Sequence, residues 1–199
     1  MQAERYGTRI IENPKKVIEE ITNFTLTSNE LSASFASGGM QLNYDYFFEI
    51  KKKLLDKYRR GEHKGIRYIT FIDKDNVDAV KKFLDAGAKI KHVRNLPPMS
   101  FGISDKQMIT TLEKMEGGKV IQSMLISNDV MYIKYFAPIF DELWDKGINA
   151  RERIKDIEEG RETDDELADA KQYLNLVLQE VSNMKNKAEQ QEKEQKNSV

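Results

Sequence analysis

Histidines and carboxylates are the side chains of this sequence that could do acid–base or metal chemistry. The 199 residues include only two histidines, His63 in a basic turn and His92 on a predicted strand. A histidine-based acid–base or metal site would need both brought together from distant elements. Cysteine is absent, which excludes disulfides, thiolate metal sites and cysteine nucleophiles.

Three carboxylates follow one predicted strand directly: Asp73, Asp75 and Asp78. Ligands commonly bind at the carboxyl ends of strands in α/β folds, and carboxylates there could hold a hard cation. Alternatively, they cap the next helix and favour its dipole. The segment lacks the turn glycine of a calcium loop, and Leu84 stands where the bidentate glutamate would fall. We therefore favour capping, and ligand contact at this edge stays open.

Polar residues at strand ends supply a hypothetical ligand-binding set. Its members are Asp73, Asp75, Asn76, Arg94, Ser127 and Asn128. The pairs Gly38-Gly39 and Gly117-Gly118 are isolated turn signals without the spacing of a phosphate-binding loop. We therefore predict a protein that is not an enzyme, with no catalytic residue, no metal and no cofactor.

A basic segment is the one candidate for contact with an anionic partner. It contains Lys51, Lys52, Lys53, Lys57, Arg59, Arg60, His63, Lys64 and Arg67. The solvated outer face of an amphipathic helix looks the same, and we favour that explanation. The formal net charge of −1 provides no global basic field, so we do not expect nucleic acid as a partner.

Elements that must position these residues follow from hydrophobic periodicity and turn signals. Helices are predicted over 14–26, between Tyr44 and Gly61, between Asp73 and Gly87, and over 129–146; strands are predicted over 31–37, 65–72, 88–94, 99–104, 107–112 and 120–127. Alternating helices and strands followed by a run of strands predict an α/β sandwich with a mixed sheet over residues 1–150.

The last part of the chain is predicted to be helical. We expect an exit helix and hinge over 151–162, broken near Gly160, then a heptad helix over 163–191 and a frayed tail over 192–199. The a and d positions are Leu167, Ala170, Leu174, Val177, Val181, Met184 and Ala188. Three of the four g–e pairs in a parallel dimer have opposite charges. We therefore predict a homodimer through this coiled-coil-type helix, although docking onto its own domain stays an alternative.

No membrane segment is expected. The chain opens with the polar residues Met1-Gln2-Ala3-Glu4-Arg5, and it contains no run of eighteen apolar residues. We therefore expect a cytoplasmic protein without membrane contact.

Several short segments resemble the sensor domain that precedes the output modules of archaeal histidine-kinase-like signalling proteins. They are 65–70 (GIRYIT), 74–76 (KDN), 126–128 (ISN) and 140–146 (FDELWDK), with 151–154 (RERI) and 157–160 (IEEG) in the exit helix. The resemblance covers about residues 10–160. It implies a phospholipase-D-like α/β fold related to the effector-binding domain of TrmB-type regulators.

The resemblance also implies a motif to look for, because active phospholipase-D-type enzymes carry H-x-K-x4-D. With Asp105 as the aspartate, Pro98 and Ser100 take the places of the histidine and the lysine. A shift by one residue offers Met99 and Phe101, which cannot serve either. The resemblance therefore implies a retained pocket without the chemistry.

These observations give three hypotheses. The leading one is a sensory or adaptor protein in signal transduction or transcription regulation. It would bind a small effector or a signalling partner and dimerise through its C-terminal helix. The second is a metal-dependent hydrolase of the phosphodiesterase type, using Asp73, Asp75 and Asp78. The third is a nucleic-acid-binding adaptor that uses the basic face of residues 51–67.

Overall fold

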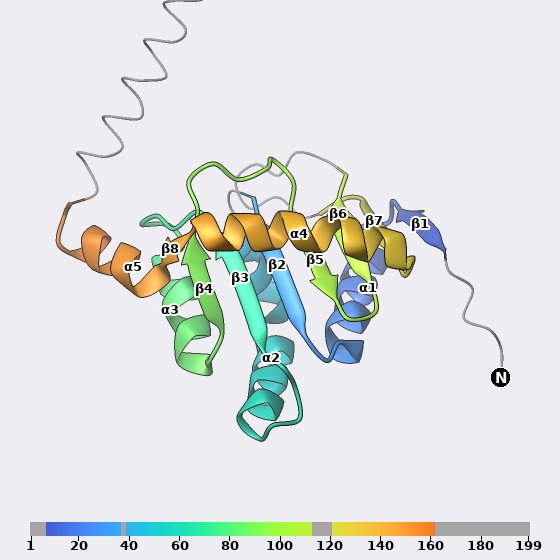
Figure 1. The fold of residues 1–199 in the computed structure, drawn as a ribbon, viewed down its shortest axis with the longest axis horizontal. Helices are drawn as coiled ribbons and strands as arrows, with labels where there is room; N and C mark the ends of the chain where they lie inside the picture. The colour runs from blue at the N-terminus through green and yellow to red at the C-terminus, as the bar shows by residue number, and fades with distance from the viewer. Residues whose placement is uncertain (1–6, 37–38, 113–120, 162–199) are drawn as a thin grey trace, which may run out of the picture. The chain divides into compact units, whose positions relative to one another are not determined.

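The structure is a computed structural model that describes residues 7–36, 39–112 and 121–161. The chain divides into two compact units, Met1–Ile154 and Lys155–Val199. The described strands form one eight-stranded mixed sheet in the order β1-β7-β6-β5-β2-β3-β4-β8 (Figure 1). Their bounds are β1 Thr8–Ile11, β2 Leu31–Phe35, β3 Ile66–Thr70, β4 Lys89–His92, β5 Phe101–Ser104, β6 Met108–Thr111, β7 Met124–Ser127 and β8 Ile148–Asn149.

One half of the sheet is parallel. β2 pairs with β3, and β3 pairs with β4, in parallel register through Leu31 opposite Ile66 and Tyr68 opposite Ile90. Parallel neighbours need a crossover, and helices α2 (Gly39–Arg59) and α3 (Val77–Ala86) supply it. These two helices cover one face of the strands and α4 (Val130–Lys146) crosses the other, which explains the β-branched and aromatic composition of the strands.

The other half of the sheet is an antiparallel meander of β5, β6 and β7, joined to β2 through β5. The edge strands β1 and β8 pair antiparallel with β7 and β4. The sequence did not predict these two strands. They have only four and two residues, and most of their side chains are exposed, so neither shows a period-two hydrophobic pattern.

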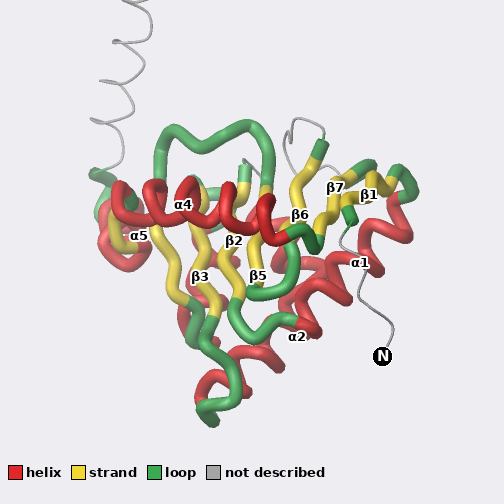
Figure 2. Tube along the Cα trace, turned by 45° about the vertical axis from the view of Figure 1, so that its right-hand side comes forward, coloured by secondary structure: helices red, strands yellow, loops and turns green. Residues whose placement is uncertain are grey.

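Helices cover both faces of the sheet (Figure 2). Helix α1 (Pro14–Thr27) lies with α2 and α3 on one face, and α4 (Val130–Lys146) crosses the other. Helix α5 spans Ala150–Glu158. The prediction of an α/β sandwich with a mixed sheet is confirmed.

Local sequence explains where the helices begin and end. Asn13 caps α1 by accepting hydrogen bonds from the backbone N–H groups of Lys15 and Lys16, and proline stands at the first helical position. Gly87 ends α3 with φ 108°, a left-handed conformation that suits glycine. Helix α4 continues through Pro138.

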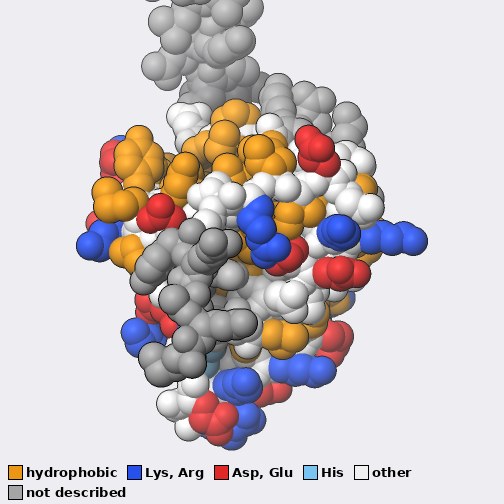
Figure 3. Space-filling model, turned by 90° about the vertical axis from the view of Figure 1, so that its right-hand side faces the viewer, with side chains coloured by type: hydrophobic (Ala, Val, Ile, Leu, Met, Phe, Trp, Pro, Cys, Tyr) orange, Lys and Arg blue, Asp and Glu red, His pale blue; other side chains and the backbone are white. Residues whose placement is uncertain are grey.

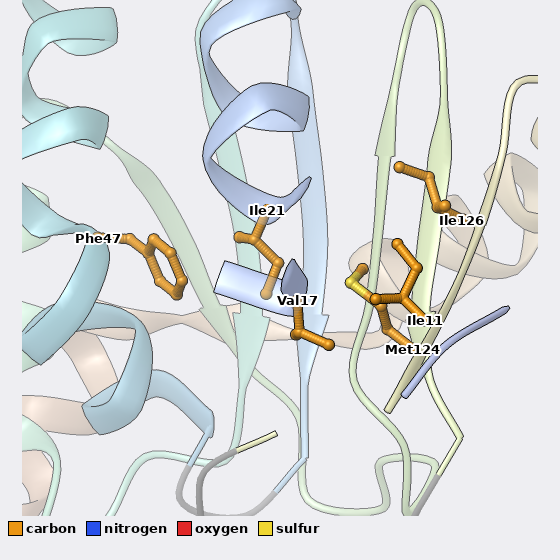
Figure 4. Packing of buried hydrophobic residues seen from close by; sticks show 6 residues of the cluster. All are labelled: Ile11, Val17, Ile21, Phe47, Met124 and Ile126. Carbon is orange, nitrogen blue, oxygen red and sulfur yellow. The ribbon is translucent and has the colours of Figure 1, made fainter. Parts of the chain in front are cut away.

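The core has a cluster on each face of the sheet. Ile11, Val17, Ile21, Phe47, Met124 and Ile126 pack between α1, α2 and strands β1 and β7 (Figure 4). Ile69, Phe101, Ile103 and Met108 pack against Phe140 of α4. A sheet with both faces covered needs these two apolar layers.

The outer side of α4 is unusually apolar. Met131 and Tyr135 are 71% and 69% exposed, and Ile10 of β1 is 59% exposed. Figure 3 views the molecule from its β1 side and shows hydrophobic side chains gathered on the upper part of that face. Within the described ranges, no helix has the length and the apolar character that crossing a membrane requires.

Candidate ligand-binding cavity

Helix α2 carries a polar side chain on its buried face. Asn43, Phe47 and Lys51 follow one another at intervals of four residues and therefore share one side of the helix. All three are buried, and Lys51 is only 3% exposed. Lysine is almost never fully buried without a partner, so this position calls for a physical explanation.

Lys51 packs against Tyr68 on β3. The Nζ atom lies 5.3 Å from the centre of the Tyr68 ring. Burial lowers the pKa of the Lys51 amine from 10.5 to about 7, because the surroundings disfavour the charged form. Burial likewise raises the pKa of Tyr68, against a smaller opposing effect of Asn43. Near neutral pH, Lys51 is therefore poised between amine and ammonium, whereas Tyr68 stays neutral.

Two buried polar atoms beside Lys51 lack hydrogen bonds. Neither Asn43 Nδ2 nor Tyr68 Oη has a partner among the described residues, although Asn43 lies beside the Tyr68 hydroxyl. An unpaired buried polar group costs about 1–3 kcal/mol. Natural proteins keep such groups mainly where a ligand or water completes them.

Lys51 and Asn43 line a cavity of about 60 Å³ between the sheet and helices α1 and α2. Its other walls are mostly apolar: Ile21, Phe24, Phe35, Leu42, Phe47, Phe101, Ile109, Ile121 and Met124, with Gly39, Gly102, Ser100, Thr110 and Thr111. Such a volume holds about four to six water-sized groups. An apolar cavity with a few converging polar groups is typical of a small-molecule site.

Ser100 anchors the cavity wall at the start of β5. Its hydroxyl accepts a hydrogen bond from the Ala36 backbone N–H at 3.0 Å, and its own N–H donates to the Thr111 hydroxyl at 3.0 Å. Ser100 therefore ties together the carboxyl ends of β2 and β6. It also stands at the lysine position of the H-x-K-x4-D pattern, with Pro98 at the histidine position.

Asp105, the aspartate of that pattern, lies at the other end of β5. Its carboxylate accepts hydrogen bonds from the Asn29 backbone N–H at 2.8 Å and from the Asn29 amide at 2.7 Å. Partial burial would raise its pKa, but these hydrogen bonds outweigh that effect and lower it. Asp105 therefore fixes a loop and does not line the cavity.

Residues 73–76 form a hydrogen-bonded turn before α3, whose N-cap residue Asn76 makes no side-chain cap hydrogen bond. Asp73 Oδ1 accepts hydrogen bonds from the N–H groups of Asp75 and Asn76, at 3.0 and 3.1 Å. Asn76 in turn accepts from the Asp73 N–H and donates to the Phe71 carbonyl. Across the described ranges, no three histidine, aspartate or glutamate side chains gather into a group that could hold a metal ion.

The six predicted ligand contacts do not come together. Asp73, Asp75 and Asn76 follow β3, and Arg94 follows its parallel neighbour β4. Ser127 ends β7 and Asn128 follows it; this strand runs opposite to β3 and lies beyond β2, β5 and β6. The two groups therefore lie at opposite ends of the strands, on opposite sides of the sheet's centre. None of the six lines the cavity, and their contact with a ligand stays a prediction.

Both histidines have structural positions. His63 Nδ1 accepts from the Gly65 N–H, and His92 Nδ1 accepts from the Ile72 N–H at 2.8 Å. Burial lowers the pKa of both, that of His92 to about 4 with smaller contributions from the Arg153 and Arg94 charges. They belong to different elements and stay neutral at pH 7, so the structure does not bring them together as an acid–base pair.

Several basic residues of the predicted face are buried or have partners within the protein. Lys51 is buried, Arg60 pairs with Glu62, and Arg67 pairs with Asp141 on the α4 side of the sheet. Arg59 donates to the carbonyls of residues 85 and 86 and pairs with Asp56, and Lys64 pairs with Glu30. The ion-paired Arg59, Arg60 and Lys64 stay solvent-exposed, as do Lys52, Lys53 and Lys57.

The sequence analysis grouped Lys51 with the outer basic cluster and did not predict that it is buried. The signal was present, because Lys51 falls on the same helical spacing as Phe47, Leu54 and Leu55. The heptad residues Leu167, Ala170, Leu174, Val177, Val181, Met184 and Ala188 lie outside the described residues.

Comparison with known proteins supports the fold. No protein-family model and no curated protein sequence matches the chain. Among solved structures, it is similar to TrmBL2, described as an archaeal chromatin protein with a novel mode of DNA binding, at TM-score 0.52 and 12% identity. That match covers 75% of this chain and 56% of TrmBL2, so the chain spans little more than half of that protein.

Two further structures are matched over nearly their whole length. NucT from Helicobacter pylori has TM-score 0.54 and 10% identity, over 73% of this chain and 99% of that one. Nuc from Salmonella typhimurium, a phospholipase D family member, has TM-score 0.52 and 13% identity, over 73% and 98%. At these identities the likeness shows the fold alone. The described domain has a phospholipase-D-like mixed α/β fold.

Proposed function

We propose that the chain is a non-catalytic sensory or adaptor protein that binds a small effector in the cavity lined by Lys51 and Asn43. One observation carries the proposal: the buried Lys51 and the unpaired Asn43 amide stand in the mostly apolar wall of this cavity, and Ser100 stands in it where the motif has a lysine. Serine at that place and Pro98 at the histidine place supply neither the nucleophile nor the phosphate-binding cation.

The proposal also says how effector binding is transmitted to a partner. The resemblance to archaeal sensor domains, together with the heptad pattern of residues 163–191, supports a homodimer that passes effector binding on to a signalling or regulatory partner. Occupancy of the cavity would act on that partner only if the effector favours one arrangement of the chain over another.

A thermal-shift screen with metabolites tests effector binding. At least one compound should raise the unfolding temperature of the wild type, and Ile121→Trp should abolish the shift by filling the cavity. Ile10→Trp is the matched control, because it puts the same side chain on an exposed isoleucine outside the cavity. Equal shifts in both variants would place binding elsewhere.

An activity assay tests the non-catalytic part of the proposal. Bis(4-nitrophenyl) phosphate should stay intact with Mg²⁺, Mn²⁺ or Zn²⁺. Metal-dependent hydrolysis that Asp75→Ala abolishes would instead support the phosphodiesterase-type hydrolase. If the wild type hydrolyses the substrate without metal and Ser100→Ala is slower, the cavity takes part in the reaction and the protein is an enzyme.

Nucleic-acid binding is the second candidate. It draws on the fold shared with TrmBL2, which is described as binding DNA, and on the exposed Lys52, Lys53 and Lys57 of α2. Three neighbouring cations on one helix are a small patch, and dimerisation would double it. Retarded mobility of DNA or RNA at low salt, lost in the triple Lys→Gln variant, would support this candidate, whereas unchanged mobility would dispose of it.

A further inference from the structure

The chemistry of the cavity indicates the kind of effector it accepts. Lys51 and Asn43 both line the cavity, two turns apart on α2, and both side chains end in nitrogen donors. No carboxylate lines the cavity among the described residues, and burial alone accounts for the lowered pKa of Lys51. The polar end of the cavity is therefore rich in donors and has no anion of its own.

Apart from the Ser100, Thr110 and Thr111 hydroxyls, which make hydrogen bonds within the protein, the rest of the cavity is apolar. Phe24, Phe35, Phe47, Ile109 and Met124 form walls that offer no hydrogen bonds from their side chains. A strongly hydrated ligand such as a sugar or a nucleotide would lose hydrogen bonds there without replacement. The volume of about 60 Å³ also limits the buried part of a ligand to a few carbon atoms beside its polar head.

Resting on the proposed effector-binding function, we propose that the cavity binds a small monocarboxylic acid with an apolar body. The carboxylate would accept a hydrogen bond from the Lys51 ammonium and one from the Asn43 amide, and its hydrocarbon part would contact the aromatic wall. An oxyanion of this kind supplies an acceptor for the unpaired Asn43 amide and a counter-charge for the Lys51 ammonium.

Binding would be coupled to a proton. When the anion enters while Lys51 is an amine, Lys51 takes one proton from solvent, and the buried site then holds an ammonium and a carboxylate with no net charge. Tyr68 is the titratable group packed against Lys51, and it stays neutral. No other titratable side chain lines the cavity among the described residues. Affinity should therefore fall about tenfold per pH unit above about 7.

Sodium butyrate and butyramide are matched probes, since they have similar size and shape but only one carries a charge. The full chain is titrated with each, and binding is followed by the NMR signals of isoleucine methyl groups. Butyrate should bind about tenfold or more tightly than butyramide near pH 7. Its affinity should fall at about pH 8 and above, whereas that of butyramide should not change.

Variants connect the effect to the named residues. Lys51→Met should weaken butyrate binding about tenfold or more and remove its pH dependence, and Asn43→Leu should weaken it less. Lys52→Met is the matched control on the exposed side of the helix and should bind like wild type. Denaturation curves would check that each variant is folded.

The outcomes separate this inference from the proposed function. Equal affinity for the two probes, or butyrate binding unchanged in Lys51→Met, would overturn the acid proposal. If other metabolites shift the cavity methyl groups while short acids do not, the effector function stands and the ligand class is wrong. If no compound shifts them, both proposals fail.

Discussion

Lys51 Nζ lies 5.3 Å from the centre of the Tyr68 ring, and both side chains are buried in the layer between α2 and the sheet. An aliphatic residue at position 51 would fill this place without a desolvation penalty. The lysine therefore lowers the stability of the fold. Functional sites commonly carry such a cost in stability, and Lys51 lines the cavity.

The first prediction concerns this cost. The folded-state pKa of Lys51 is about 7 and its ordinary value is 10.5, so between these pH values the unfolded chain binds more protons. Stability should therefore rise with pH through this window and fall as pH drops toward 7. The full effect is about 5 kcal/mol at about 1.4 kcal/mol per pH unit.

Urea denaturation of Lys51→Met measures the effect. The variant should be more stable than wild type by a few kcal/mol at pH 7, and the difference should shrink at pH 9.5. Lys52→Met, on the exposed side, should change stability by less than about 0.5 kcal/mol at either pH. A pH-independent difference between wild type and Lys51→Met would show that Lys51 keeps an ordinary pKa.

The second prediction concerns acid sensitivity. The folded-state pKa of His92 is about 4, against 6.5 ordinarily, because burial and two arginine charges disfavour the imidazolium. The unfolded chain therefore binds more protons between these values, and stability should fall by about 3 kcal/mol as pH drops from 6.5 to 4. His92→Asn can keep an acceptor near the Ile72 N–H and should lose this part of the pH dependence. An equally steep curve in the variant would contradict the assignment.

The third prediction concerns the attachment of α4. The Arg67 guanidinium lies 4.9 and 5.5 Å from the ring centres of Phe140 and Trp144, and it pairs with Asp141 at 3.0 Å. Arg67→Met should cost about 1–2 kcal/mol of unfolding free energy, mainly through lost contact with the two rings. Asp141→Asn removes only an exposed ion pair and should cost less than about 1 kcal/mol. Equal costs would mean that the ion pair, not the stacking, holds the helix.

The fourth prediction concerns the C-terminal heptads. Leu174→Asp with Val181→Asp puts two charges at a positions and should turn a dimer into a monomer in light scattering at tens of micromolar. Gln179→Asp adds a charge at an outward f position and should leave the dimer intact. A wild type that is already monomeric at this concentration would end the pairing hypothesis, as would a dimer that survives the double substitution.

Much of the fold was predictable from the sequence, because long elements carry strong periodic patterns. The helices over 14–26 and 129–146 and the strand over 65–72 correspond to α1, α4 and β3 within a few residues. The start of α2 was placed too late. It begins at Gly39, five residues before the first aromatic residue of its apolar stripe.

The site was less predictable, because it depends on which strands become neighbours. Ser127 and Asp73 belong to one predicted ligand-binding set, yet the antiparallel direction of β7 puts Ser127 at the opposite end of the strands. Lys51 looked like part of a charged surface, and only the packing of α2 over Tyr68 gives it a buried environment.

Isoleucine methyl NMR tests the central claim, that an effector occupies this cavity, most directly. Ile21, Ile109 and Ile121 line the cavity, whereas Ile10 and Ile148 are exposed outside it. A compound that stabilises the protein in the metabolite screen should shift the first three signals saturably and leave the other two unchanged. Saturable shifts at Ile10 or Ile148 with the cavity signals unmoved would contradict the account.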